Sequence, residues 1–230
     1  MEAKISIFLD TSDLDKIREF NNFGIIRGVT TNPTILKKNH GLKSIKELKQ
    51  IAIEISEIIA PYPLSIEVNS NDYDEMLEQA KLFSEWHKNI NVKITIHGPD
   101  GESYNLKAIN IIENKFKIKV NVTAMMSAQQ CLLAMYAGAS YVSLFGGRIN
   151  NIGHSAIDEI SKTRELIDLH GFKSKIIVGS VREAVNVSDW LIAGAHIVTT
   201  TPEILEVMLV HPYTKETVKQ FMIDGEQIIK

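Results

Sequence analysis

The segment Asn91-Val92-Lys93-Ile94-Thr95-Ile96 is the most informative stretch of this 230-residue sequence. Its apolar and β-branched residues are typical of a buried strand. Lys93 stands inside that run, and burying an unpaired ammonium group costs free energy. The same burial favours the uncharged amine, which is a nucleophile towards carbonyl carbons. The segment therefore predicts either a structural ion pair with Glu67 or Asp10, or a catalytic amine.

Helix-periodic segments on both sides of this strand, and a second β-branched run after it, predict a strand–helix–strand unit. The same alternation runs along the whole chain. The predicted strands are Ile5–Asp10, Gly24–Thr30, Leu64–Val68, Val92–Ile96, Lys119–Thr123, Tyr141–Phe145, Lys175–Gly179 and His196–Thr199. The predicted helices are Ser12–Asn21, Ser44–Ile59, Asp72–His87, Tyr104–Lys115, Ser127–Ala137, Ala156–Leu169, Arg182–Ala193 and Pro202–Leu209.

This alternation predicts an α/β protein. Parallel strands joined by right-handed crossovers follow from it, and eight such units favour a closed barrel. We therefore expect residues 1–230 to form a single (β/α)8 TIM barrel, with an extra amphipathic helix at 214–229. Only one helix is predicted between Thr31 and Leu64, which makes this stretch the weakest match to the pattern. At the first helix, Ser12 is the expected N-cap, with Asp15 three residues later.

Composition excludes several classes of function. The formal charge of −3, without a basic block, argues against nucleic acid as a partner. No apolar run approaches the roughly 18 residues that span a membrane, and the N-terminus does not resemble a signal peptide, so a cytoplasmic protein without membrane contact is expected. The lone Cys131 stands in an apolar helix and is expected to be a buried, unreactive side chain. Scattered histidines and the lack of a phosphate-loop or GxGxxG motif predict no metal and no cofactor.

Polar side chains gather at the predicted strand ends, which is where (β/α)8 enzymes build their active sites. In chain order these residues are Asp10, Thr30, Thr31, Asn32, Glu67, Lys93, Thr95, His97, Asn121, Thr123, Ser143, Arg148, Ser180, Arg182, Thr199, Thr200 and Thr201. Two of the chain's five arginines, Arg148 and Arg182, are among them. Arginine presents a planar fork that suits phosphate oxygens, and Ser180 with the backbone N–H groups after it adds to an anion site. A small phosphorylated carbonyl compound is the implied ligand.

Each of these residues also has a structural interpretation. Asp10 and Asn32 can cap helices, Thr123 and Ser143 can be ordinary strand hydroxyls, and both arginines can form surface salt bridges. Each structural role is plausible singly. Their joint occurrence at one end of a barrel favours a catalytic site.

The ordered motifs resemble the small single-domain branch of the transaldolase family, which includes fructose-6-phosphate aldolase. They are Leu9-Asp10-Thr11-Ser12, Gly28-Val29-Thr30-Thr31-Asn32-Pro33-Thr34, Asn91-Val92-Lys93-Ile94, Asn121-Val122-Thr123, Phe145-Gly146-Gly147-Arg148-Ile149 and Gly179-Ser180-Val181-Arg182. The resemblance covers nearly the whole chain in the same order, and the stretch from Gly28 to Thr34 is highly specific.

The resemblance implies a metal-free class I aldolase in which Lys93 forms a Schiff base. It implies that Asp10 is the acid/base group and that Glu67 and Thr123 hold a catalytic water. It implies that Asn32 orients the dihydroxyacetone unit and that Arg148, Ser180 and Arg182 form the phosphate site. Thr31, Ser143 and Phe145, at the ends of their strands, are further expected substrate contacts. Small family members form rings, so a homo-oligomer, pentamer or decamer, is expected, with helix 214–229 packed on a neighbour.

Two positions bear on the activity that the resemblance implies. Aldolase members carry glutamine and tyrosine where this chain has Glu67 and Phe145, so the pattern favours a transaldolase. The expected reaction moves a dihydroxyacetone unit from sedoheptulose 7-phosphate or fructose 6-phosphate to an aldose phosphate, in the pentose phosphate pathway.

Three alternatives stay open. One is an aldolase that releases dihydroxyacetone, and another is a sugar-phosphate binder without catalysis. The third is a related enzyme of an uncommon sugar pathway, because the segment Thr95–Tyr104 is longer than in relatives and is expected to lie directly above Lys93.

Overall fold

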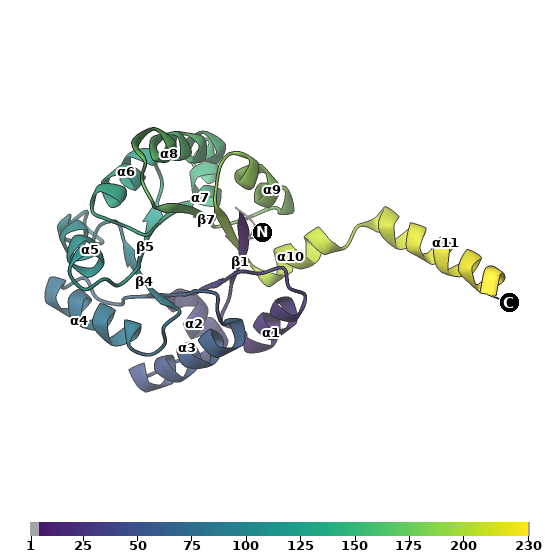
Figure 1. Cartoon of the computed structure of the whole chain (residues 1–230), viewed down its shortest axis with the longest axis horizontal. Helices are drawn as coiled ribbons and strands as arrows, with labels where there is room; N and C mark the ends of the chain where they lie inside the picture. Colours follow the sequence, from purple (N-terminus) through teal and green to yellow (C-terminus); the bar gives the residue numbers. More distant parts are fainter. Residues whose placement is uncertain (1–4, 230) are drawn as a thin grey trace.

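The computed structural model describes residues 5–229 and forms a closed barrel of parallel strands in the order β1 to β8, with β8 pairing back to β1 (Figure 1). The predicted TIM barrel is confirmed. The strands are β1 (Ser6–Asp10), β2 (Val29–Thr30), β3 (Leu64–Glu67), β4 (Ile90–Thr95), β5 (Val120–Met125), β6 (Tyr141–Phe145), β7 (Lys175–Gly179) and β8 (Ile197–Thr200).

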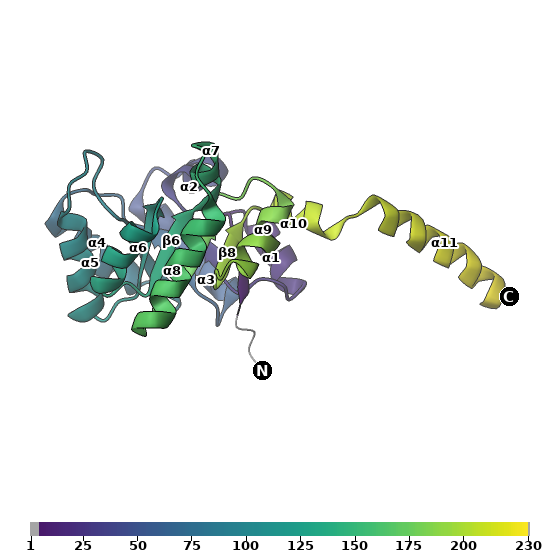
Figure 2. The same ribbon diagram turned by 90° about the horizontal axis from the view of Figure 1, so that it is seen from above.

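Helices surround the barrel and alternate with its strands. They are α1 (Leu14–Asn22), α2 (Pro33–His40), α3 (Ile45–Ile59), α4 (Tyr73–Ser84), α5 (Tyr104–Asn114), α6 (Ala128–Tyr136), α7 (Gly146–Asn151), α8 (Ala156–His170), α9 (Ala184–Ile192), α10 (Pro202–Leu209) and α11 (Pro212–Ile229). The extra C-terminal helix is confirmed, and it projects away from the barrel beyond α10 in both views (Figures 1 and 2). No helix in residues 5–229 is long and apolar enough to cross a membrane.

One predicted strand is too long, and two helices were missed. The second strand is only Val29–Thr30, the two residues that pair in register with β1 and β3. Before it, the chain turns at Gly24, whose φ is +70°, and Arg27 and Gly28 form single backbone hydrogen bonds with Ile7 and Leu9 of β1. Helices α2 and α7 were not predicted. In α2, the Asn32 side chain accepts a hydrogen bond from the Ile35 amide and Pro33 occupies the first turn. Both features favour the start of a helix. They were missed because Asn32 was interpreted as the end of the preceding strand.

The cap of α1 also differs from the prediction. Asp13, not Ser12, is the N-cap, and its carboxylate accepts hydrogen bonds from the amides of Asp15 and Lys16. Ser12 is fully buried and accepts a hydrogen bond from the Asn39 side chain of α2. Ser12 therefore joins the two helices that follow β1 and β2.

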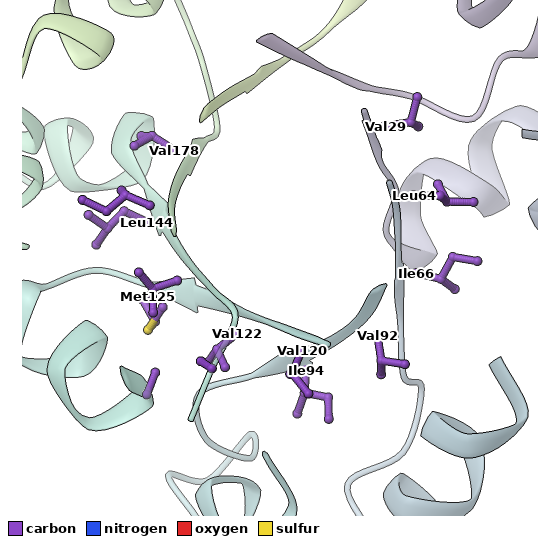
Figure 3. Close-up of a cluster of buried hydrophobic side chains, with 14 of the residues drawn as sticks. Val29, Leu64, Ile66, Val92, Ile94, Val120, Val122, Met125, Leu144 and Val178 are labelled. Carbon is purple, nitrogen blue, oxygen red and sulfur yellow. The ribbon is translucent and has the colours of Figure 1, made fainter. Parts of the chain in front are cut away.

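Side chains alternate along each strand between the helical shell and the barrel interior. The labelled side chains of β2 to β7 in Figure 3, such as Ile66, Val92 and Val122, point away from the ring of strands and into the apolar core beneath the helices. Burying a residue of this kind stabilises the fold by roughly 1.5–3 kcal/mol. The intervening residues, including Lys93 and Asn121, therefore face the interior, and this alternation positions the site.

Candidate active site

A cavity of about 910 Å³ opens at the carboxyl ends of the strands. Most residues singled out in the sequence line it: Asp10, Asn32, Glu67, Lys93, Thr123, Ser143, Phe145, Arg148, Ser180 and Arg182. Thr31 does not, because its hydroxyl donates a hydrogen bond to the Ser65 carbonyl (3.0 Å) within the wall between β2 and β3. Parallel strands end at one edge of a barrel, so residues that are distant in sequence converge on a single cavity.

Lys93 lies at the inner end of this cavity, and its residue is 6% exposed. Its Nζ donates a hydrogen bond to the Thr31 carbonyl (2.9 Å) and lies 3.2 Å from Glu67 Oε2. Adjacent strands place the pair together, because Glu67 and Lys93 are register partners on β3 and β4. The ion pair considered from the sequence is therefore present, and it also gives Lys93 a carboxylate that can accept a proton.

Asp10 ends β1 and lines the same cavity. Burial within the barrel raises the pKa of its carboxyl above the ordinary value of 3.8, although the Lys93 charge and a hydrogen bond from Thr30 act in the opposite direction. Thr30 Oγ1 donates that hydrogen bond to Asp10 Oδ1 over 2.6 Å. A carboxyl that holds its proton more readily than usual suits a group that must both accept and return one.

Thr123 contributes an unusual hydroxyl. Its Oγ1 is buried and has no hydrogen-bond partner among the described residues. The next residue, Ala124, has φ +61°, and the β5–β6 register shifts here, so the strand bulges where it reaches the cavity. A buried unpaired hydroxyl lining a cavity is a ready partner for a bound water or substrate.

The side chain of Asn121 is held by two serines. Ser143 Oγ donates to Asn121 Oδ1 (2.6 Å), and Asn121 Nδ2 donates to Ser65 Oγ (3.2 Å). All three residues are buried, and they belong to β3, β5 and β6. This network fixes polar groups below the mouth of the cavity, so the inner wall beside Lys93 is rigid as well as polar.

The two arginines of the candidate phosphate site come from helix α7 and from the β7–α9 loop, which are in close contact. A Cβ on Gly147 would collide with the carbonyl oxygen of Ser180 and lie 2.9 Å from Arg182 Cγ, so only glycine lets α7 approach the β7–α9 loop. Arg148 stacks over the Phe145 ring at 5.5 Å. Within residues 5–229 neither Arg148 nor Arg182 forms a salt bridge, so both guanidinium groups remain available to an anion.

The segment after β4 lies elsewhere than expected. Among the described residues, none from Ile96 to Tyr104 lines the cavity. The loop closes on itself instead: the Gly98 amide donates to the Glu102 carbonyl, and Asn105 Nδ2 donates to the Thr95 carbonyl (both 3.0 Å). These bonds fold the extra residues away from Lys93, so the expectation that they lie directly above it was wrong.

Sequence reasoning missed part of the rim. Lys16, Lys38 and Asn39 of α1 and α2, with Glu203 and Glu206 after β8, also line the cavity. Lys16 Nζ lies 2.8 Å from Glu206 Oε1, which joins α1 to α10 across the lip. Their positions in the first helices after β1, β2 and β8 are the signal that could have identified them. No group of three His, Cys, Asp or Glu residues in the described chain is placed to hold a metal ion.

Cys131 behaves as the sequence predicted. It is fully buried on α6, and burial raises the pKa of its thiol to about 12. A thiol with so little thiolate at neutral pH is a poor nucleophile.

Comparison with solved structures shows the fold. A thiamine phosphate pyrophosphorylase from Pyrococcus furiosus superposes with a TM-score of 0.61 at 12% identity, over 86% of each chain. A mandelate oxidase matches with a TM-score of 0.56 at 10% identity, over 87% of this chain and 65% of the other. At such identities the likeness concerns the barrel alone.

Comparison with protein sequences shows the family. The model of the family described as "Transaldolase/Fructose-6-phosphate aldolase" matches residues 7–230. A protein of Alkaliphilus metalliredigens named "Probable transaldolase" is 35% identical over 98% of this chain and 100% of its own length. Proteins with the same name from Carboxydothermus hydrogenoformans (37%; 96% and 98%) and Streptococcus pyogenes (38%; 96% and 97%) match similarly. The chain therefore belongs to the transaldolase and fructose-6-phosphate aldolase family of enzymes.

Proposed function

We propose that the protein is a transaldolase that moves a dihydroxyacetone unit, by way of a Schiff base on Lys93, from a ketose phosphate to an aldose phosphate. Sedoheptulose 7-phosphate or fructose 6-phosphate is the donor, as in the pentose phosphate pathway. The observation that carries the proposal is one cavity with Lys93, Glu67 and Asp10 at its inner end and two arginines without carboxylate partners near its mouth.

The first stage is imine formation. Lys93 transfers a proton to a neighbouring carboxylate, for which Glu67 at 3.2 Å is the nearest candidate. The neutral amine then attacks C2 of the ketose and forms a carbinolamine. The C2 hydroxyl leaves as water after protonation, which yields the iminium ion. Glu67 and the unpaired Thr123 hydroxyl hold the water that carries these protons.

The second stage is carbon–carbon cleavage. Asp10 takes the proton of the C4 hydroxyl, the C3–C4 bond breaks, and its electron pair flows into the iminium nitrogen to give an enamine. The aldose phosphate leaves. The enamine then attacks the aldehyde carbon of a second aldose phosphate, Asp10 returns its proton to the new hydroxyl, and hydrolysis frees Lys93. Arg148, Ser180 and Arg182 hold the phosphate group, while Asn32 and Ser143 orient the three-carbon unit.

Phe145 and Glu67 favour transfer over release. Both line the cavity, and Phe145 offers no phenol that would deliver a proton to the enamine. A protonated enamine would hydrolyse to free dihydroxyacetone, which is the aldolase outcome. That aldolase activity is the second candidate.

The test is reductive trapping. Sodium borohydride with fructose 6-phosphate should leave a covalent adduct on the peptide that carries Lys93, detected by mass spectrometry. Lys119→Met, at the opposite end of the barrel, is the matched control and should still be trapped. A wild-type protein without an adduct contradicts the Schiff base.

A second assay separates transfer from release. Cleavage of fructose 6-phosphate is measured with and without erythrose 4-phosphate. Strict dependence on the acceptor supports a transaldolase, whereas dihydroxyacetone accumulating at the same rate without acceptor identifies an aldolase.

We further propose that residues 1–230 form a single domain and that the protein is cytoplasmic. Copies of the chain assemble into a pentamer or decamer, in which α11 packs on a neighbouring copy. Most described side chains of α11 are exposed, including Tyr213 (74%), Phe221 (67%) and Met222 (65%). An apolar surface of this size on an isolated helix is unfavourable in water.

Light scattering of the full chain tests this assembly. Phe221→Glu with Met222→Glu should give a smaller species, whereas Lys219→Glu, a control on the same helix, should not. A wild-type monomer contradicts the proposal.

A further inference from the structure

Asp10 is the end of a chain of hydroxyl groups that crosses three strands. Thr30 Oγ1 lies 2.6 Å from Asp10 Oδ1 and also 2.6 Å from Thr199 Oγ1. The three residues belong to β2, β1 and β8, which are neighbours in the barrel. Thr30 is 2% exposed and Thr199 is 7% exposed. Thr199 was noted in the sequence only as one of several polar residues at strand ends.

Counting donors shows what Thr199 adds. Thr30 has a single hydroxyl proton, and an ionised carboxylate can only accept. When Asp10 is ionised, Thr30 therefore donates to Asp10, and Thr199 must donate to Thr30. When Asp10 Oδ1 carries a proton, the order reverses: Asp10 donates to Thr30, and Thr30 donates to Thr199. The chain is complete in both protonation states because each hydroxyl both donates and accepts.

A carboxyl that changes protonation state twice in each turnover gains from such a chain. Without Thr199, no hydroxyl would donate a hydrogen bond to Thr30 when Asp10 is ionised. When Asp10 is protonated, no hydroxyl would accept the hydrogen bond that Thr30 donates. Hydrogen bonds in a buried chain polarise one another, so the contact between Thr30 and the Asp10 carboxylate would weaken.

We propose that Thr199 is a positioning residue that acts through Thr30 to complete the hydrogen bonds of Asp10 in both protonation states, and that it stabilises the ionised carboxylate most, because hydrogen bonds to a charged group are the stronger ones. The inference rests on the proposed function, in which Asp10 accepts and returns the proton of the C4 hydroxyl. Thr199 lines the same cavity as Asp10, but its part in the reaction is to complete the hydroxyl chain.

Several charged groups act on Asp10, and the test must leave them unchanged. Lys93 faces it from β4, and Glu67 lines the cavity from β3. Asp13, Lys16, Lys38, Glu203 and Glu206 line the rim, and Arg148 and Arg182 also line the cavity. Substituting a threonine by valine alters no charge, so a shift in the pH profile reports the hydroxyl chain and not a new electrostatic field.

The chain offers a matched control on the same strand. Thr200 is also buried, but its hydroxyl has no hydrogen-bond partner among residues 5–229. Because side chains alternate along a strand, Thr200 faces the helical shell while Thr199 faces the interior. Thr199→Val and Thr200→Val therefore make the same chemical change one residue apart, and only the first breaks the chain.

The experiment measures kcat and kcat/KM for the transfer reaction against pH. Thr199→Val should lower kcat by about three- to tenfold, the size expected for one net hydrogen bond, with little change in KM. The acidic limb of the profile should shift to higher pH, because an Asp10 carboxylate with a weaker donor binds its proton more tightly. Thr199→Ser, which keeps the hydroxyl, and Thr200→Val should match the wild type. The proposal is overturned if the pH profile of Thr199→Val coincides with that of the wild type. It is also overturned if Thr199→Ser shows the same shift as Thr199→Val, or if Thr200→Val shifts equally.

A second readout separates this proposal from the proposed function. The infrared difference spectrum between wild type and Asp10→Asn isolates the carboxyl stretch of Asp10, whose titration needs no turnover. Its midpoint should move to higher pH in Thr199→Val, and also in Thr199→Ala if the valine variant folds poorly. Loss of borohydride trapping in the wild type would defeat the Schiff-base function alone, whereas an unmoved Asp10 midpoint would defeat the role of Thr199 alone.

Discussion

The lower layer of the barrel interior consists of Phe8, Ile177 and Ile197, with Tyr141 packed against them, whereas the upper layer holds Asp10, Glu67 and Lys93. The two layers meet on β1, where Asp10 is two residues beyond Phe8. The other residues of the lower layer come from β6, β7 and β8, and those of the upper layer from β3 and β4. The lower layer gains free energy from apolar burial. The upper layer places ionisable groups where water is scarce, which costs free energy. Stability and chemistry are thus separated along the barrel axis, and the apolar layer closes the floor of the cavity.

The largest expected effect concerns the upper layer. Lys93→Ala removes the amine that accepts the electron pair, so kcat/KM for dihydroxyacetone transfer should fall by at least about 10⁴-fold. A coupled assay with fructose 6-phosphate and erythrose 4-phosphate measures this. Lys119→Ala, just before β5 at the other end of the barrel, should retain wild-type rates. Substantial activity in Lys93→Ala would show that catalysis does not depend on the upper layer.

The next effect concerns the lower layer. Phe8 is 3% exposed and its ring packs where a Cβ on Gly28 would lie 2.6–2.8 Å away. Phe8→Ala should lower the free energy of unfolding by about 3–5 kcal/mol through lost burial and a cavity. Urea unfolding followed by circular dichroism measures it. Phe23→Ala, at a position 51% exposed, is the control and should cost roughly 1 kcal/mol or less. Equal losses in both variants would show that the lower layer is not the stabilising one.

A smaller effect is expected at the mouth. Arg182→Lys keeps the charge but loses the planar fork, so kcat/KM for phosphorylated donors should fall about tenfold, mainly through KM. Arg164→Lys, whose guanidinium pairs with Asp168 on the outside of α8, should leave the kinetics unchanged. If kcat/KM of Arg182→Lys falls as much for an unphosphorylated ketose donor as for a phosphorylated one, Arg182 is not a phosphate ligand.

The smallest effect tests the cost of the upper layer. Because burial raises the pKa of Asp10 in the folded protein, an ionised Asp10 destabilises the fold at neutral pH. The cost is absent below the ordinary value of 3.8 and grows as pH rises to the folded pKa. Asp10→Asn should therefore be inactive yet more stable at pH 7, by about 1.4 kcal/mol for each unit of the shift. Chemical unfolding at pH 7 and near pH 4 measures this, and a variant that is less stable at pH 7 would contradict the sign.

Much of the fold was accessible from the sequence because its signals are local. Strand alternation and helix periodicity located every strand of the barrel and nine of the helices within residues 5–229, since each depends on neighbours a few residues away. The exceptions are the start of β2, which is Val29 and not Gly24, and the short helices α2 and α7, which follow β2 and β6 directly. Strand ends also predicted most of the cavity lining, because parallel strands in a barrel share one exit face.

By itself, then, the sequence determined the alternating elements and the polar residues that follow the strands. Only the tertiary structure decided which of them meet. Ring closure between β1 and β8 brings Thr199 to Thr30 and Asp10, a contact across 169 residues between the two threonines. A hydrogen bond from the Thr31 hydroxyl to the Ser65 carbonyl holds Thr31 in the wall, and backbone hydrogen bonds fold the Thr95–Tyr104 loop onto itself and away from Lys93. The close approach at Gly147 brings α7, which carries Arg148, against the β7–α9 loop, which carries Arg182. These outcomes depend on steric fit and hydrogen bonds between distant segments, which no local pattern records.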